Sequence, residues 1–156
     1  MLDRLKRRAF WMISRTAIFG YSHFPVFGRL RASIAIVRRG ELFLAIERND
    51  GIGLSLPGGL ARFWESDEEV MSRELFEETG LRAAAQSLLM RYESSKPYRA
   101  LVTAYEVQTV GEIRGSWEGD PRWVTLDELW RRLVGSKSPL LEVLESGNRA
   151  ISSKQR

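Results

Sequence analysis

One segment near the middle of the chain carries the signals of a helix at both of its ends. Ser66 belongs to the residue types that cap helix N-termini, and Glu69 follows three residues later, which completes a capping box. Gly80 is the residue type that most often ends a helix. We therefore expect a helix over residues 67–79. Because this helix stands among segments with strand signals, the chain is restricted to folds that combine helices with a sheet.

The chain on either side of this helix alternates strand and turn signals. Arg39-Gly40 is a short turn between two apolar runs, which predicts a β-hairpin, and Pro57, Gly58 and Gly59 predict a tight turn before the helix. The expected strands lie around 34–36, 42–46, 54–56, 88–93, 99–108 and 122–125, and short helices are expected over 126–134 and 140–144. This order predicts the α/β class, as an α/β/α sandwich with a mixed sheet, plus an N-terminal amphipathic helix.

The 156 residues have the length of one domain, and we divide them into three parts. Residues 1–30 are expected to form a basic amphipathic helix and a linker, residues 31–145 a globular domain, and residues 146–156 a frayed tail. Arg15 and His23 interrupt the apolar run of the first part. We therefore expect neither a membrane-spanning helix, which needs about 20 apolar residues, nor a cleaved signal peptide.

The net charge of +4 is an average over two opposite patches. Residues 1–31 contain seven basic residues and one acid, whereas residues 65–80 contain seven acids and one base. A basic chain suggests nucleic acid or an anionic surface as a partner. The N-terminal helix has three interpretations: packing on the domain or on a second subunit as a homodimer contact, binding to an anionic membrane surface, or binding to nucleic acid. No nucleic-acid-binding motif supports the last interpretation, and we expect no nucleic acid as a partner.

Three glutamates of the expected helix fall on one of its faces. Glu74, Glu77 and Glu78 are spaced i, i+3 and i+4, which spreads them over about a quarter-turn. Like charges at this spacing repel, and a divalent cation would remove that cost. The chain has no cysteine and a single histidine, His23, so zinc–thiolate and multi-histidine sites are excluded. Oxygen ligands favour Mg²⁺, with Mn²⁺ as an alternative; a solvated acidic face is the other interpretation of these residues.

Nine residues from the end of the expected turn to the end of the expected helix stand at fixed spacings. They are Gly59, Glu65, Arg73, Glu74, Leu75, Glu77, Glu78, Gly80 and Leu81. Together they resemble a complete Nudix box, the motif of the Nudix hydrolase family. The order of elements over about 31–145 also resembles that family, as does the segment 123–129. Residues 1–30 lie outside the resemblance.

The resemblance implies an enzyme, a Nudix hydrolase, that cuts a pyrophosphate bond in a nucleoside diphosphate derivative with Mg²⁺ or Mn²⁺. The positions carried over as metal ligands are Glu74, Glu77, Glu78 and the backbone carbonyl of Gly59. Arg73 is expected to orient the carboxylates, and Glu65 to stand at the start of the helix and pair with Arg73. Many members of the family place a general base or an extra metal ligand on a later loop. Glu118 is our candidate for that role, ahead of Asp120 and Glu112.

The resemblance leaves the substrate open among nucleoside triphosphates, ADP-ribose-like compounds and dinucleoside polyphosphates. A proline or a tyrosine shortly after the motif marks different branches of the family, and this chain has both, as Pro97 and Tyr98. The candidate substrate contacts are Arg48, Phe63 and Tyr98. We expect a nucleotide-derived small molecule as partner and a cytoplasmic, or alternatively membrane-peripheral, location. A catalytically idle Nudix-fold module that binds nucleotides is the alternative function.

Overall fold

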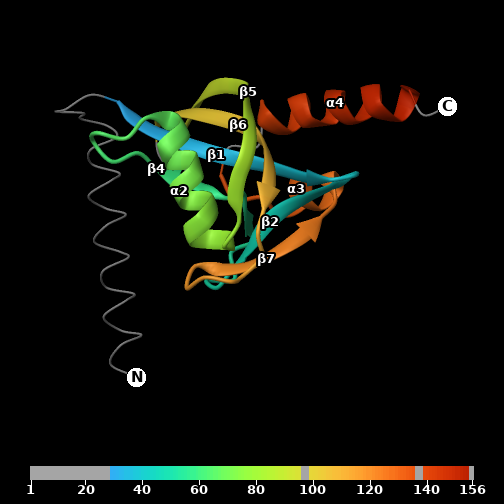
Figure 1. Ribbon diagram of the computed structural model, residues 1–156. Helices are drawn as coiled ribbons and strands as arrows, with labels where there is room; N and C mark the ends of the chain where they lie inside the picture. The colour runs from blue at the N-terminus through green and yellow to red at the C-terminus, as the bar shows by residue number, and fades with distance from the viewer. Residues whose placement is uncertain (1–28, 96–98, 136–138, 155–156) are drawn as a thin grey trace.

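The computed structural model of the chain describes residues 29–95, 99–135 and 139–154 (Figure 1). The N-terminal helix expected within residues 1–28 and the candidate contact Tyr98 lie outside these ranges. Of the helices within them, none is long and apolar enough to cross a bilayer.

Seven strands and three helices make up the described part of the chain. The strands are β1 (Leu30–Arg39), β2 (Leu42–Arg48), β3 (Leu54–Ser55), β4 (Gly58–Leu60), β5 (Arg82–Ser94), β6 (Ala100–Val110) and β7 (Gly119–Val124). The helices are α2 (Asp67–Thr79), α3 (Leu126–Arg132) and α4 (Leu140–Lys154). β1 pairs in parallel with β6 and antiparallel with β2 and β4, while β3 and β7 pair with β2 and β5 pairs with β6. The sheet is therefore mixed, as expected.

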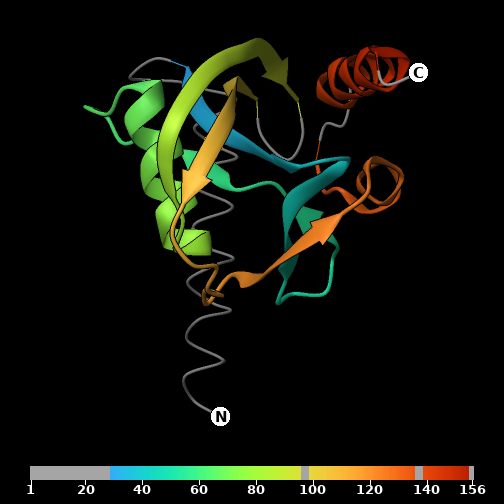
Figure 2. The ribbon, with the colours of Figure 1, turned by 45° about the vertical axis from the view of Figure 1, so that its right-hand side comes forward.

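β1 belongs to two groups of strands. Residues 30–37 run parallel to β6, in register with residues 100–107. Beyond this point β1 pairs with β2 through Arg38 and Arg39. β1 and β6 therefore part at their carboxyl ends, and β2 and β7 stand apart from β5 and β6 (Figure 2).

Two hydrophobic cores lie on opposite faces of the strands, because successive strand residues point to opposite sides. Ala35 and Val37 of β1 share one core with Met71 and Leu75 of α2. Ile36 belongs to the other core, which also contains residues of α3 and α4. These two helices lie on the far side of the strands from α2 (Figure 2). The predicted α/β/α sandwich is confirmed.

Strand β4 stands where the sequence predicts a tight turn at residues 57–59. It pairs with β1, with Gly58 opposite Ile34 and Gly59 opposite Ser33. Gly58 permits this close approach, because a Cβ at that position would collide with the carbonyl oxygen of Ser33. The glycines therefore bring the backbone that leads into α2 directly against the central strand.

Helix α4 is longer than the sequence predicts. It continues to Lys154, beyond the short helix expected over 140–144 and through most of the expected frayed tail. Arg38 of β1 donates a hydrogen bond to the side-chain oxygen of Asn148. This contact connects the second half of α4 to the sheet, which local residue patterns do not predict.

Candidate active site

Helix α2 begins and ends at the predicted residues. The Ser66 hydroxyl accepts a hydrogen bond from the Glu69 backbone N–H at 3.2 Å, and the Ser66 backbone N–H donates to the Glu69 carboxylate at 2.8 Å. Gly80 has a φ of 75°, a left-handed conformation that favours glycine, and its N–H donates to the Phe76 carbonyl at 2.9 Å. Leu75 is fully buried, which turns the opposite face of the helix outward.

Arg73 is held by Glu65 through two hydrogen bonds. Its Nε donates to Glu65 Oε1 at 2.6 Å and its Nη2 donates to Oε2 at 2.9 Å, and the two side chains are only 17% and 9% exposed. This bidentate pair lowers the pKa of Glu65 to about 2. The Arg73 Nη1 also donates to Glu74 Oε1 at 2.6 Å. The expected pairing of Glu65 with Arg73 is present, and it extends to the first glutamate of the acidic face.

Glu74 and Glu78 turn toward strand β4. The Gly58 backbone N–H donates to Glu78 Oε2 at 2.9 Å. The Glu74 carboxylate lies so close to Gly59 that a Cβ on this glycine would collide with it. Burial raises the pKa of Glu78, which is 5% exposed, to about 9, and burial also raises the pKa of Glu74. Both carboxyl groups therefore occupy a place that disfavours an uncompensated negative charge.

Glu118 lies in the loop before β7 and faces the same two glutamates. Its side chain hydrogen-bonds with that of Glu78, and its negative charge adds to the rise in the pKa of both Glu78 and Glu74. The Glu118 carbonyl accepts a hydrogen bond from the Asn49 backbone N–H at 2.9 Å, which holds the loop. Arg48 of β2 interacts electrostatically with Glu118 and Glu78. The fold thus brings one arginine and three carboxyl groups together; we call Glu74, Glu78 and Glu118 the acidic group.

Asn49 and Asp50, which follow β2, position this arrangement although no motif marks them. The Asn49 side chain donates to the Trp117 carbonyl at 3.0 Å. The Arg48 Nε donates to Asp50 Oδ1 at 3.1 Å. The sequence Asn-Asp-Gly signals a turn here, but it does not indicate which distant loop the turn holds.

Glu77 and Phe63 are not members of the acidic group in the structure. The Glu77 side chain is 52% exposed, with its Oε2 atom 3.4 Å from the Arg73 Nη1. Phe63 is 87% exposed in the loop between β4 and α2, which precedes the start of that helix, whereas Glu78 lies near its end. Tyr98 falls outside the described residues.

The donors of the acidic group suit a hard divalent cation. Its side-chain donors are carboxyl oxygens, which Mg²⁺ and Mn²⁺ prefer. Glu78 and Glu118 are in hydrogen-bond contact, so they need either a proton or a cation between them. Within the described ranges, however, no three carboxylate or histidine groups converge as a formed metal site. The chemistry of the residues therefore fits a cation, and the final coordination requires side chains to adjust.

Comparison with known proteins places the chain in a family. The model of the NUDIX domain family matches residues 28–144. A MutT-like protein from Streptomyces ambofaciens is 32% identical over 100 residues, which cover 64% of this chain. The match spans 65% of that relative, slightly less than two thirds of its length.

Solved structures with the same fold include three that illustrate its range. A MutT structure from work on Aliivibrio salmonicida and Vibrio cholerae has a TM-score of 0.64 at 21% identity, covering 76% of this chain and 99% of that one. The E. coli ORF135 protein has a TM-score of 0.65 at 23% identity, with 75% and 89% covered. The NUDIX domain of Shewanella oneidensis NrtR, complexed with ADP ribose, has a TM-score of 0.63 at 17% identity, with 81% and 96% covered. These likenesses show the fold, and the family match over residues 28–144 shows that the chain belongs to the Nudix hydrolase family.

Proposed function

We propose that the chain hydrolyses a pyrophosphate bond in a nucleoside diphosphate derivative and depends on Mg²⁺, with Mn²⁺ as an alternative ion. The observation that carries this proposal is the acidic group, in which the buried carboxyl group of Glu78 is in contact with the exposed Glu118 and is close to Glu74. Such an arrangement is costly in a buried place unless a proton or a cation compensates it. A pyrophosphate brings more negative charge, and Mg²⁺ shared between carboxylates and phosphates is the usual solution.

The proposed metal ligands are the residues of the motif that carry oxygen donors. They are Glu74, Glu77, Glu78 and the carbonyl of Gly59. The cation, when bound, would stabilise negative charge on the phosphoryl oxygens. Glu77 must turn inward from its exposed position to take part. Arg73 is proposed as a positioning residue, because its bidentate pair with Glu65 fixes the guanidinium that holds Glu74.

Glu118 is proposed as the general base. It would accept a proton from the attacking water while the water oxygen forms a bond to phosphorus. The bond from that phosphorus to the bridging oxygen breaks, and its electron pair stays on the departing phosphate. The contact of Glu118 with Glu78, and the hydrogen bond from Asn49 that holds its loop, support this role.

A nucleotide derivative is the proposed substrate, and the enzyme is proposed to act in the cytoplasm. The NUDIX domain of NrtR was solved with ADP ribose, which supports this substrate class. Arg48 stands beside Glu78 and Glu118, where a cation suits contact with substrate phosphates. The rings of Phe63 and Tyr98 are proposed to stack on the base; Phe63 is exposed, as such a contact requires.

An alternative function is a Nudix-fold module that binds nucleotides without turnover. The lack of a formed three-carboxylate site in the described residues favours this alternative. The complete set of motif glutamates favours hydrolysis.

A substrate panel separates the two functions. The panel contains nucleoside triphosphates, ADP-ribose, dinucleoside polyphosphates and nucleotide sugars, each with Mg²⁺, Mn²⁺ or EDTA. We expect cation-dependent release of a nucleoside monophosphate or of phosphate from at least one compound. Tight binding of a compound without turnover, with either ion, would favour the binding module.

For the N-terminal segment we propose either peripheral contact with an anionic membrane or a homodimer contact. The full chain and a form lacking residues 1–30 are compared by sedimentation with anionic vesicles and by light scattering. Loss of vesicle binding in the shorter form would support membrane contact, and loss of the dimer would support self-association. Identical behaviour in both assays would contradict both proposals.

A further inference from the structure

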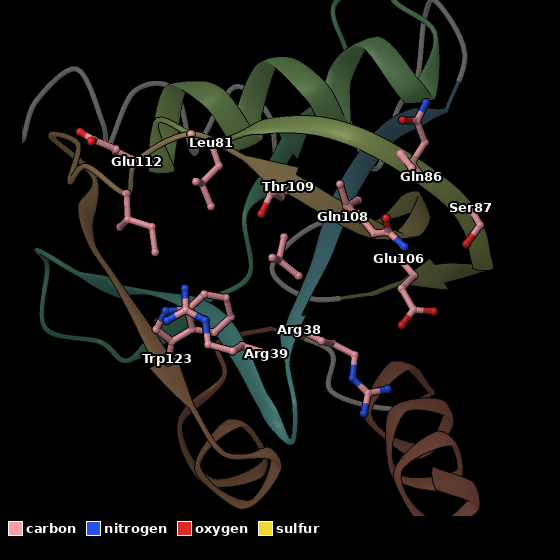
Figure 3. Close-up of a pocket in the computed structure, with 15 residues that line it drawn as sticks. Arg38, Arg39, Leu81, Gln86, Ser87, Glu106, Gln108, Thr109, Glu112 and Trp123 are labelled. Atoms are coloured by element: carbon pink, nitrogen blue, oxygen red, sulfur yellow. The ribbon is translucent and has the colours of Figure 1, made fainter.

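A cavity of about 830 Å³ opens where β1 and β6 part (Figure 3). One wall comes from the end of β1 and from β7, and the opposite wall from β5, β6 and the turn after β6. None of Glu74, Glu78, Glu118 and Arg48 is among the described residues that line it. The cavity is therefore distinct from the acidic group.

Arg39 forms a fixed positive group on the first wall. Its guanidinium carbon lies 4.4 Å from the centre of the Trp123 ring, in the geometry of a cation–π contact. The indole supports the planar guanidinium from one side and leaves its N–H edges to meet an anion. The neighbouring Arg38 points away toward α4 (Figure 3), where it binds Asn148. Arg38 also lines the cavity, but its guanidinium is engaged by Asn148, so Arg39 is our candidate for contact with an anion.

The opposite wall carries polar side chains that are able to hydrogen-bond to hydroxyl groups. Glu106 and Gln108 lie on the same side of β6, two residues apart, and both project toward the β1 wall (Figure 3). Thr109 follows them with its hydroxyl at the same cavity. A carboxylate accepts from sugar hydroxyls, as the acidic residue that binds ribose does in dinucleotide-binding folds. The cavity therefore has a cationic planar wall and a hydroxyl-binding wall.

We propose that this cavity is a second nucleotide site that takes a nucleoside monophosphate, with the phosphate on Arg39 and the ribose on Glu106 and Gln108. The guanidinium fork matches phosphate geometry, and small-molecule pockets of about 300 to 1,000 Å³ enclose ligands of drug size, a range that includes this cavity. A nucleoside monophosphate is also a product of the proposed hydrolysis. The site would therefore respond to product, but its binding can be measured without any turnover.

The test follows the Trp123 indole N–H by NMR while AMP is added to the ¹⁵N-labelled full chain in EDTA. The W123F variant assigns the Trp123 signal. We expect this signal to shift and saturate with AMP, and to do so at lower concentration than with inorganic phosphate or adenosine alone. In the proposed site, the phosphate of AMP contacts one wall and its ribose contacts the other. The proposal would be overturned if inorganic phosphate alone, or adenosine alone, bound as tightly as AMP.

Two arginine variants make the test specific. R39A should weaken AMP binding about tenfold or more, since a charge-assisted bidentate contact is lost, and R39K should fall between R39A and the wild type. R82A is the matched control, because Arg82 also stacks on an aromatic ring, Phe76, but does not line the cavity. R82A should bind AMP like the wild type. A Trp123 signal that AMP does not move, or equal binding by R39A and the wild type, would overturn the proposal even if the hydrolysis is confirmed.

Discussion

Strand β2 carries charged residues of two clusters that differ in their balance of charge. Arg48 belongs with the acidic group, whereas Glu47, the preceding residue, points to the other face of the strand. There Glu47 accepts hydrogen bonds from Arg122 at 2.8 Å and from Arg132 at 3.0 Å. Glu128 contacts the same two arginines, at 3.0 Å and 3.1 Å. This paired cluster contains two acids and two bases.

The pKa values of the two clusters shift in opposite directions. The hydrogen bond from Arg132 lowers the pKa of Glu47, so this carboxylate is stable as an anion. Burial raises the pKa of Glu78 to about 9, and the nearby glutamates add to the rise. In the paired cluster, the charges are therefore balanced in the folded protein without any bound ion, and the cluster connects β2, β7 and α3. The acidic group needs a bound proton or cation to balance its negative charge, which is the property expected of a binding site.

The largest expected effect comes from E78Q. This substitution should lower cation-dependent turnover by about a hundredfold or more, because even the loss of a group that only supports a metal ligand costs about ten- to a hundredfold. Turnover is measured on the best compound of the substrate panel with Mg²⁺. The fold should remain intact, since glutamine still accepts from the Gly58 N–H. Turnover equal to that of the wild type would remove Glu78 from the site.

R73A should have the largest effect on stability. It leaves Glu65 without its bidentate partner in a place where that side chain is 9% exposed. Breaking a buried ion pair by removing one partner costs about 3 to 5 kcal/mol, and partial exposure of this pair places the expected loss near the lower end. Urea unfolding measures the change. R73K keeps the charge but not the fork, so it should restore only part of the loss.

Two carboxyl groups, Glu65 in its ion pair with Arg73 and Glu78 in the acidic group, predict opposite pH dependences in EDTA. The pKa of Glu65 falls from 4.5 to about 2 on folding, so its contribution is present above pH 4.5 and is lost as the pH falls toward 2. The pKa of Glu78 rises from 4.5 to about 9, so the folded state binds the extra proton and loses stability as the pH rises from 4.5 to 9. As the pH falls from 4.5 toward 2, the free energy of unfolding should decrease less steeply in E65Q than in the wild type. As the pH rises from 4.5 to 9, it should decrease less steeply in E78Q than in the wild type. Parallel curves for E78Q and the wild type would contradict the assignment.

The smallest effect is expected for E47Q, the matched change in the paired cluster. It should lower the thermal midpoint slightly and change turnover by less than about twofold, because surface ion pairs contribute little. The same turnover assay and a thermal melt check this. A loss of turnover comparable to that of E78Q would show that the balance of charge in a cluster does not determine whether the cluster takes part in catalysis.

Local signals predicted much of the fold, and contacts distant in sequence account for the differences. The limits of α2 followed from Ser66 and Gly80, whose capping interactions involve near neighbours only. The strand at Gly58 depends on its close approach to β1, and the second half of α4 is in contact with β1 through Asn148 and Arg38. A sequence read along the chain contains neither pairing.

In the candidate site, too, some positions follow from local sequence and others follow only from the fold. Motif spacing placed Glu74 and Glu78 together, since both lie on one helix. It also placed Glu77 on that face, although in the structure this side chain is exposed. The position of Glu118 beside Glu78 depends on a loop held by Asn49, which comes from another strand end. Spacing within one helix is thus predictable, whereas the loop that completes the site requires the fold.

Direct measurement of Mn²⁺ binding tests most directly whether the acidic group is a cation site. Electron paramagnetic resonance reports free Mn²⁺ in titrations of the wild type, E78Q and E47Q without any substrate. The wild type and E47Q should bind Mn²⁺ with the same affinity, and E78Q should bind at least about tenfold more weakly, because it loses a proposed ligand. Equal binding by all three proteins, or no binding by the wild type, would contradict the acidic group as a cation site.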